Sequence, residues 1–424
     1  MDFVTSITNG GIVRQDIFSD NYKTDSIVLS FYMPLDKITA TNIALLCAVL
    51  KRGNARFGEM DKIGAFLEKN YGASFSVSTA KAGELQELSV SIRFLDDRFA
   101  IDGERVSESM VDFLSAVLFE PMLENGGFKA SFVTQEKQNL KDKIASLIND
   151  KRAYSLEMCK RVMFKDEKYG TYELGDTDVV DTITPQSLYA FYKSMLESAM
   201  LVVSYGGVKR DTEALFAPVF SKLDGSLRTK PTTKVVNSVS DVRYEIEEMN
   251  VSQSKLNIGF RLGDAAMSDP FAYKMFNVIF GSSPTSKLFM NVREKMSLCY
   301  YCASTADTLK NVMFVYSGIE TADYEKARDE ILRQLDAMKM GDITAEEFDN
   351  ARAYLVDSYV QSKDSLDALI SLQTSSLIRD IGLDPDAQIE KVREVTPERV
   401  VRVAKDIMLD TVYLLKGVGG NENE

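Results

Sequence analysis

The most informative stretch of this chain is GSSPTSKLFMNVREKMSLCYYCASTA, residues 281–306. Ser283 and Pro284 are typical of a helix start, because a serine side chain can cap the first turn and proline fits the first helical position. The apolar residues that follow recur at every fourth position, at Leu288, Val292 and Met296. This spacing predicts a helix with one buried side. The run CYYCASTA after it predicts a strand.

Two side chains in this stretch could act on a peptide. Arg293 falls in the last turns of the predicted helix, and Tyr300 falls at the start of the predicted strand. A guanidinium and a phenol on adjoining rigid elements can both donate hydrogen bonds to one peptide carbonyl. Taken alone, the pattern favours the ordinary alternative, in which Arg293 is a solvated charge and Tyr300 packs on a sheet.

Length, composition and charge set bounds on the whole chain. With 424 residues the chain exceeds a single hydrophobic core, so at least two domains are expected. A net charge of −13 argues against nucleic acid and anionic membranes as partners. The longest apolar run, 43–50, is too short to cross a bilayer. No signal peptide is recognisable and four cysteines give no disulfide framework, so we expect a cytoplasmic location.

The sequence contains no histidine. This absence excludes Ser-His-Asp and Cys-His nucleophile systems and imidazole general bases. It also excludes every metal site that depends on histidine ligands. Any catalysis by this chain would therefore have to proceed without histidine.

The order of predicted elements indicates a duplicated α+β unit. In each half, two strands precede helices, a strand pair, long helices and a closing strand. The stretch 66–80, FLEKNYGASFSVSTA, aligns without gaps on 292–306, VREKMSLCYYCASTA, with five identical residues. We therefore expect two tandem α/β-sandwich domains, at 1–220 and 241–424. The linker is expected at 221–240, which lacks a sustained apolar pattern and is rich in Ser, Thr and Lys.

The long helices are expected in equivalent places of the two halves. Helical patterns run over about 129–164 in the first half and over 322–340 and 345–378 in the second. The pattern over 345–378 predicts one continuous helix.

The central motif resembles the second-domain signature of the insulinase/pitrilysin zinc metallopeptidase family, SxLFxxxREKxxLxY. In that family the Arg and Tyr of the motif bind the substrate backbone near the zinc ion. The resemblance therefore implies a substrate-binding role for Arg293 and Tyr300. It covers nearly all of the chain, and it also implies a clamshell of two domains around a peptide. The matching residues are Ser286, Leu288, Phe289, Arg293, Glu294, Lys295, Leu298 and Tyr300.

The zinc-binding part of the family pattern is missing. Active relatives carry His-x-x-Glu-His on a first-domain helix, where two imidazoles hold zinc and the glutamate activates water. The matching helix here reads ALLCAVLKRG, with Ala44 and Ala48 at the histidine positions and Cys47 at the glutamate position. The downstream glutamate ligand corresponds to Asp142 or Lys143. The resemblance therefore implies a chain that holds no zinc of its own.

Cys299 and Cys302 form a CxxC motif, whose spacing raises the alternatives of a redox or metal site. Positions three apart in a regular strand face opposite sides, and no second CxxC completes a four-thiolate site. We therefore favour an ordinary strand. Cys47 and Cys159 are expected to be small buried side chains.

The resemblance as a whole implies a non-catalytic subunit of a heterodimeric zinc peptidase. In some bacterial members of the family one protein brings the zinc and a similar protein brings Arg and Tyr, and this chain resembles the second kind. The expected partners are a zinc-bearing paralogous subunit, which alone would hold the metal, and a peptide substrate. In isolation the chain could form a homodimer.

The main alternative is a catalytically inert peptide-binding or structural scaffold of the same fold. An intact Arg–Tyr motif argues against a pure scaffold, which would not need it. A free-standing enzyme that uses Cys47 or the CxxC motif ranks last, because no general base accompanies these thiols.

Overall fold

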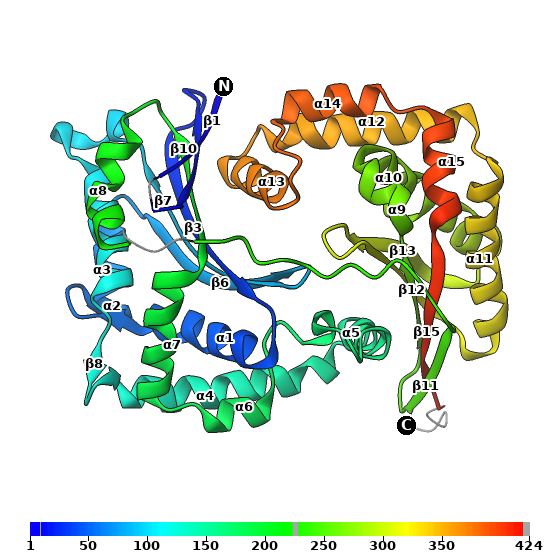
Figure 1. The fold of residues 1–424 in the computed structure, drawn as a ribbon, viewed down its shortest axis with the longest axis horizontal. Helices are drawn as coiled ribbons and strands as arrows, with labels where there is room; N and C mark the ends of the chain where they lie inside the picture. The colour runs from blue at the N-terminus through cyan, green and yellow to red at the C-terminus, as the bar shows by residue number, and fades with distance from the viewer. Residues whose placement is uncertain (9, 224–227, 419–424) are drawn as a thin grey trace. The chain divides into compact units, whose positions relative to one another are not determined.

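The computed structural model describes residues 1–8, 10–223 and 228–418 (Figure 1). The chain divides into two compact units, each a mixed α/β structure with a largely antiparallel sheet, which confirms the predicted α+β class. The chain changes from one unit to the other after residues 145, 170, 232, 361 and 384. Unit 1 contains residues 1–145, 171–232 and 362–384, and unit 2 contains 146–170, 233–361 and the residues from Pro385 onwards.

The predicted linker, 221–240, contains the change of unit between residues 232 and 233. Residues 224–227 of this segment lie outside the described part of the chain. The division into domains at 1–220 and 241–424 stays a prediction. In the described part of the chain, no helix is long and apolar enough to span a bilayer.

Unit 1 is built on a six-stranded sheet with the order β1-β2-β10-β3-β7-β6. The β2–β10 pair is parallel and the other neighbours are antiparallel. On β3, Ile27, Leu29 and Phe31 alternate into the core, as the period of two predicts. The strands are β1 (Asp2–Ile7), β2 (Val13–Phe18), β3 (Thr24–Pro34), β6 (Ser74–Ala82), β7 (Leu85–Leu95) and β10 (Met200–Gly207).

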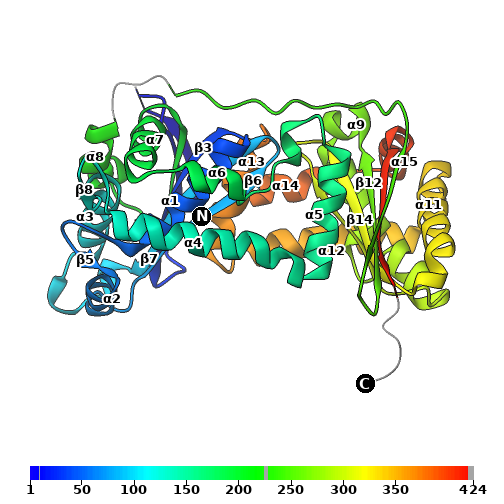
Figure 2. The same cartoon turned by 90° about the horizontal axis from the view of Figure 1, so that it is seen from below.

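Helices cover both faces of this sheet. One face packs on α1, α3 and α7, and α4 runs beside α1 (Figures 1 and 2). The opposite face of β2, β3 and β10 contacts α13. These helices are α1 (Lys37–Arg52), α3 (Val106–Phe119), α4 (Ala130–Ala145), α7 (Pro185–Ser198) and α13 (Leu366–Ile378). The smaller elements of unit 1 are β4 (Gly53–Asn54), β5 (Gly58–Glu59), α2 (Met60–Lys69), β8 (Leu123–Glu124), β9 (Gly127–Phe128), α6 (Thr177–Thr182) and α8 (Thr212–Leu223).

Unit 2 is built on a five-stranded sheet with the order β11-β15-β12-β14-β13. Its strands are β11 (Arg243–Met249), β12 (Ser254–Arg261), β13 (Cys299–Asp307), β14 (Val312–Ile319) and β15 (Met408–Gly417). Helix α5 contacts β12 and β15. The helices are α5 (Lys151–Met163), α9 (Gly263–Ser268), α10 (Pro270–Asn277), α11 (Tyr324–Met340), α12 (Ala345–Ser362), α14 (Pro385–Arg393) and α15 (Pro397–Asp406).

The connectivity of the two sheets confirms the duplication. The order β2-β10-β3-β7-β6 in unit 1 corresponds to β11-β15-β12-β14-β13 in unit 2. In both sheets the first pair is parallel and the others are antiparallel. The local turns match as well, because Tyr71 and Ser297 occupy equivalent positions of the aligned stretches and have φ values of 60° and 53°.

The prediction of one helix over 345–378 is wrong. Helix α12 ends at Ser362, and Ser365 caps the separate helix α13 by accepting a hydrogen bond from the backbone N–H of Ala368. In the first half, the helical stretch 129–164 is likewise interrupted before Asp150, whose side chain caps α5. Both breaks lie where the chain changes unit. Apolar spacing misses them because every one of these helices has a buried side.

A glycine in each sheet lets the opposing helix approach closely. A Cβ added at Gly206 on β10 would lie 3.0 Å from Cδ2 of Leu366 in α13. A Cβ added at Gly259 on β12 would lie 2.6 Å from Sδ of Met163 in α5. These helices therefore pack against backbone rather than against side chains at these points.

Candidate functional site

Arg293 is carried by a π-helix, η6 (Leu288–Lys295), rather than by the α-helix that the sequence predicts. Leu288 and Val292 are fully buried, as expected, but Met296 is exposed. The wider turn of a π-helix shifts the last residues away from the buried stripe. Segments of this kind occur frequently at functional sites.

The predicted helix cap is also one turn too early. Ser283 does not cap η6, because its Oγ donates a hydrogen bond to the carbonyl of Val278 at 3.0 Å and so closes the preceding helical segment. Ser286 takes the capping role, since its Oγ accepts from the backbone N–H of Phe289 at 3.3 Å. Pro284 lies in the turn between these two serines.

The Arg293 side chain is accessible and loosely held. It is 40% exposed, and its Nε lies 3.6 Å from Oε1 of Glu294. The guanidinium carbon lies 4.6 Å from the centre of the Phe289 ring. A ring under the guanidinium orients it without occupying its hydrogen-bond donors. Arg293 therefore keeps donors free for a ligand carbonyl or carboxylate.

Tyr300 lies at the start of β13, beside η6, and its side chain is 65% exposed. Its hydroxyl donates a hydrogen bond to Oε1 of Glu320 at 3.3 Å. The pKa of Cys299, the residue before Tyr300, is lowered mainly by a hydrogen bond with Cys302, and the Arg293 charge lowers it further. The structure thus brings Arg293 to the strand end that carries Tyr300. The substrate-binding role of the two residues stays a prediction.

Tyr300 occupies a β-bulge, which the sequence did not reveal. Cys299 pairs with Ile319 and Tyr301 pairs with Gly318, so Tyr300 is the extra residue on β13. A bulge of this kind re-aims the side chain that it carries. It also reverses the expectation for the CxxC motif, because Cys299 and Cys302 now face the same side of the strand.

The degenerate zinc motif lies on α1 in unit 1. Ala44 and Cys47 are each 6% exposed, and Ala48 is partly buried beside them. Burial raises the pKa of the Cys47 thiol to about 12, so the thiol is protonated at neutral pH. A protonated thiol and two methyl groups provide no metal ligand.

Helix α4 places a cation near this position. Lys143 is one of the charges that act on Cys47, whereas Asp142 accepts a hydrogen bond from Nε2 of Gln138 at 2.8 Å on an exposed face. Among the described residues, no group of three His, Cys, Asp or Glu side chains could hold a metal ion. The residues present therefore do not fit the zinc ion of the family.

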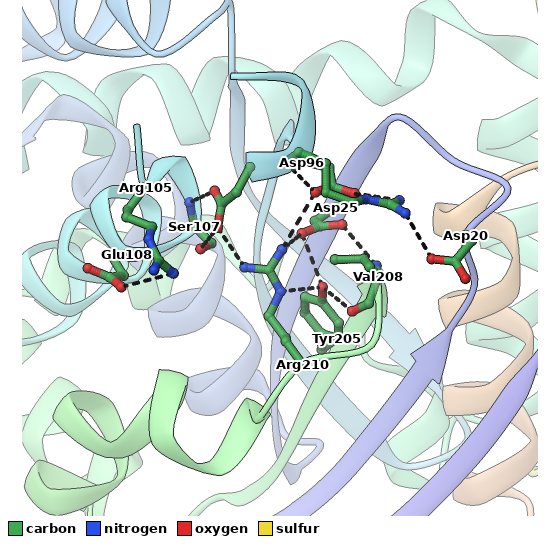
Figure 3. A network of polar contacts seen from close by, with 11 residues as sticks. Asp20, Asp25, Asp96, Arg105, Ser107, Glu108, Tyr205, Val208 and Arg210 are labelled. Carbon is green, nitrogen blue, oxygen red and sulfur yellow. Dashed lines mark hydrogen bonds and ion pairs between the residues drawn. The ribbon is translucent and has the colours of Figure 1, made fainter. Parts of the chain in front are cut away.

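A buried charge cluster at one end of the unit 1 sheet is structural (Figure 3). Arg210 contacts Oδ2 of Asp25 at 2.5 Å, Oδ2 of Asp97 at 3.0 Å and the hydroxyl of Tyr205 at 2.8 Å. Asp25 also accepts from the backbone N–H of Val208 at 3.3 Å. The cluster joins β3, β10 and the loop after β7, and its donors are occupied by these partners.

A cavity of about 500 Å³ lies in unit 1 between α13 and the sheet face of β3, β6 and β7. Its wall is rich in hydroxyl groups, and its charged members are Glu87, Arg93, Asp367 and Arg379. The sequence pattern does not reveal this cavity, because serines that alternate with apolar residues are common on any strand with one exposed face. The hydroxyl groups of the sheet come from Ser26, Ser30, Ser74, Ser76, Ser89 and Ser91.

Comparison with known proteins identifies the family. Residues 182–355 match the family model described as the peptidase M16 inactive domain. The probable inactive metalloprotease YmfF of Bacillus subtilis (strain 168) is 30% identical over 99% of this chain and 100% of its own length. The chain belongs to the M16 peptidase family.

Two solved structures share the fold of this chain over their whole length. A conserved protein from Enterococcus faecalis V583 superposes with a TM-score of 0.87 at 27% identity and covers 100% of both chains. A peptidase M16 inactive domain from Pseudomonas fluorescens superposes with a TM-score of 0.80 at 17% identity, also over 100% of both chains, and supports the fold. The chain is an M16 peptidase homologue, which confirms the resemblance of its central motif to this family.

Proposed function

We propose that this chain is the non-catalytic subunit of a heterodimeric zinc peptidase. It would supply Arg293 and Tyr300 to a paralogous subunit that holds the zinc ion and the general base. What supports the proposal above all is an accessible Arg–Tyr pair on adjoining elements in a chain whose described residues provide no zinc ligand set. The proposed location is the cytoplasm, in keeping with four free cysteines.

Each side chain would act on the peptide backbone. The Arg293 guanidinium would hold a substrate carbonyl or carboxylate with two parallel hydrogen bonds and so align the scissile bond. The Tyr300 phenol would donate a hydrogen bond to the carbonyl oxygen as it becomes an oxyanion. The partner's zinc would activate the attacking water. This chain would therefore position the substrate through Arg293 and stabilise the developing oxyanion through Tyr300.

The test is reconstitution with the zinc-bearing paralogue. Arg293→Ala and Tyr300→Phe are each expected to reduce turnover about 100-fold, the typical effect of removing one preorganised donor. Arg393→Ala and Tyr244→Phe are matched controls, because both side chains are exposed in unit 2 away from η6, and they should retain full turnover. Size-exclusion chromatography checks that each variant still forms the pair. Full activity of Arg293→Ala would refute the proposal.

The second candidate function is a peptide-binding scaffold without a role in hydrolysis. The hydroxyl-lined cavity in unit 1 favours it, because serine hydroxyls can both donate to and accept from a polar ligand. A scaffold of this kind would bind peptide in the absence of any partner. Ser89→Phe, which fills the cavity, would weaken that binding, and Arg293→Ala would leave it unchanged.

A further inference from the structure

The two cysteines of the CxxC motif are brought together by the bulge at Tyr300. Cys299 pairs with Ile319 and Cys302 pairs with Ser317 on β14. Ile319 and Ser317 are two residues apart, so they face the same side of the sheet, and their partners face that side with them. Without the bulge, Cys299 and Cys302 would point in opposite directions.

The two thiols interact and have unequal properties. The hydrogen bond between them lowers the pKa of Cys299 and raises that of Cys302 well above its ordinary value. The Ser317 hydroxyl and the Arg293 charge lower the pKa of Cys299 further. Cys299 is partly exposed, whereas Cys302 is only 3% exposed. Cys299 thus has the features of an attacking thiolate and Cys302 those of a resolving thiol.

We propose that Cys299 and Cys302 form an oxidisable dithiol that a hydroperoxide converts reversibly into a disulfide. The Cys299 thiolate attacks one peroxide oxygen, the O–O bond breaks, and Cys299 becomes a sulfenic acid. The other peroxide oxygen leaves as hydroxide or alkoxide and takes a proton from solvent to become water or an alcohol. The sulfur of Cys302 then attacks the sulfenic sulfur. The S–S bond forms, and the sulfenic oxygen leaves as water with the proton of Cys302. Two electrons pass from the thiols to the peroxide, and a dithiol reductant reverses the reaction by exchange.

The local backbone allows this closure. Cys299 is the first residue of β13, and Ser297, two residues earlier, has a φ of 53° and lies outside the ladder. The extra residue of a bulge is not held by a partner residue on the neighbouring strand. The strand start can therefore shift while β13 stays paired from Tyr301 onwards.

Closure would also move Tyr300, because this residue lies between the two cysteines. That consequence rests on the proposed function, since it matters only if Tyr300 contacts substrate. The thiol chemistry itself does not depend on a partner subunit or on a peptide.

Cys47 and Cys159 are matched internal controls. Both are buried, and burial raises the pKa of each thiol, that of Cys47 to about 12. Neither is expected to react with peroxide while the protein is folded. The contrast between the two pairs of cysteines can therefore be measured in a single molecule.

The experiment treats the purified full chain with hydrogen peroxide and locates the products by differential alkylation and mass spectrometry. We expect a loss of two hydrogens confined to the segment that contains Cys299 and Cys302, and its reversal by dithiothreitol. Cys302→Ser should instead accumulate a sulfenic acid at Cys299 that dimedone traps. Cys299→Ser should abolish both products, and Cys47→Ser should behave as wild type.

Three results would overturn the inference. The first is that Cys299 and Cys302 remain reduced under peroxide that oxidises a small free thiol completely. The second is that Cys299 of the wild type proceeds to sulfinic acid while Cys302 stays a free thiol. The third is that Cys47 is oxidised as fast as Cys299. All three are read from thiols alone, so they stay separate from a failure of the Arg293 and Tyr300 turnover test.

Discussion

Asp25 shows how burial and ion pairing compete at one residue. Burial raises the pKa of this carboxyl group to about 6, although Arg210 acts to lower it. The folded-state pKa lies above the ordinary value of 3.8, so between these two values the native state binds more protons than the unfolded state. The stability that Asp25 contributes is therefore present at low pH and is lost as the pH rises through about 6.

We predict that Asp25→Asn removes this pH dependence. Relative to wild type, the variant should become more stable as the pH rises from 4 to 7, by about 1.4 kcal/mol for each unit of pKa shift that is abolished. Urea unfolding at several pH values measures the difference. Asp349→Asn, at an exposed carboxylate, is the matched control. A stability difference for Asp25→Asn that does not change with pH would contradict the prediction.

The residues at the zinc-motif positions predict how the isolated chain behaves. With Ala44 and Ala48 in place of imidazoles and a protonated Cys47 between them, the purified chain should carry no stoichiometric zinc and hydrolyse no peptide. Elemental analysis after gel filtration measures the metal. A peptidase assay with and without 1,10-phenanthroline measures the activity. One tightly bound zinc per chain with chelator-sensitive hydrolysis would show that another ligand set exists.

At the scale of elements, the packing of α5 on β12 depends on Gly259. An added methyl group there would lie 2.6 Å from Sδ of Met163 and 3.3 Å from Cε1 of Phe314, so Gly259→Ala should force the buried Met163 side chain of α5 to repack. Overpacking of this kind typically costs about 1–3 kcal/mol. Chemical unfolding of the variant checks the direction and the size.

Gly64 in α2 provides the opposite control. It is exposed, and a Cβ built there meets nothing within 4 Å. Gly64→Ala should therefore stabilise the protein by up to about 1 kcal/mol through helix propensity. If Gly64→Ala also destabilised the protein, the steric contact with α5 would not explain the loss of stability in Gly259→Ala.

At the scale of the whole molecule, each unit needs both halves of the chain. Unit 1 takes α13 from the second half, and unit 2 takes α5 from the first. We predict that a protease cuts first within 221–240, and that the two fragments stay associated until denaturant is added. Native gel filtration followed by denaturing electrophoresis tests this.

The same arrangement predicts how separate halves behave. Residues 1–220 and 241–424 should each be poorly soluble when expressed alone, because each lacks a helix of its own unit and exposes a helix of the other. Co-expression should restore a soluble pair. Two halves that fold independently would refute the prediction. Light scattering on the intact chain would show whether or not it forms a homodimer in isolation.

The sequence by itself determined most of the order of strands and helices, the duplication, the presence of the Arg–Tyr motif and the absence of histidine from the zinc-motif positions. These features are local or compositional. Apolar periodicity reports which side of an element is buried, and a motif reports residue types at fixed spacing. The family resemblance of the motif around Arg293 and Tyr300 could therefore be recognised before any coordinates were known.

Only the tertiary structure decided in which unit α5 and α13 pack, and that Cys299 and Cys302 lie on the same side of β13. The helix pattern over 345–378 continues across the break because both helices bury one side, and periodicity does not say against which unit. The bulge at Tyr300 arises from the register between β13 and β14, two strands whose pairing is a property of the sheet. Local pattern cannot contain that information, because register is set by contacts between segments rather than within one.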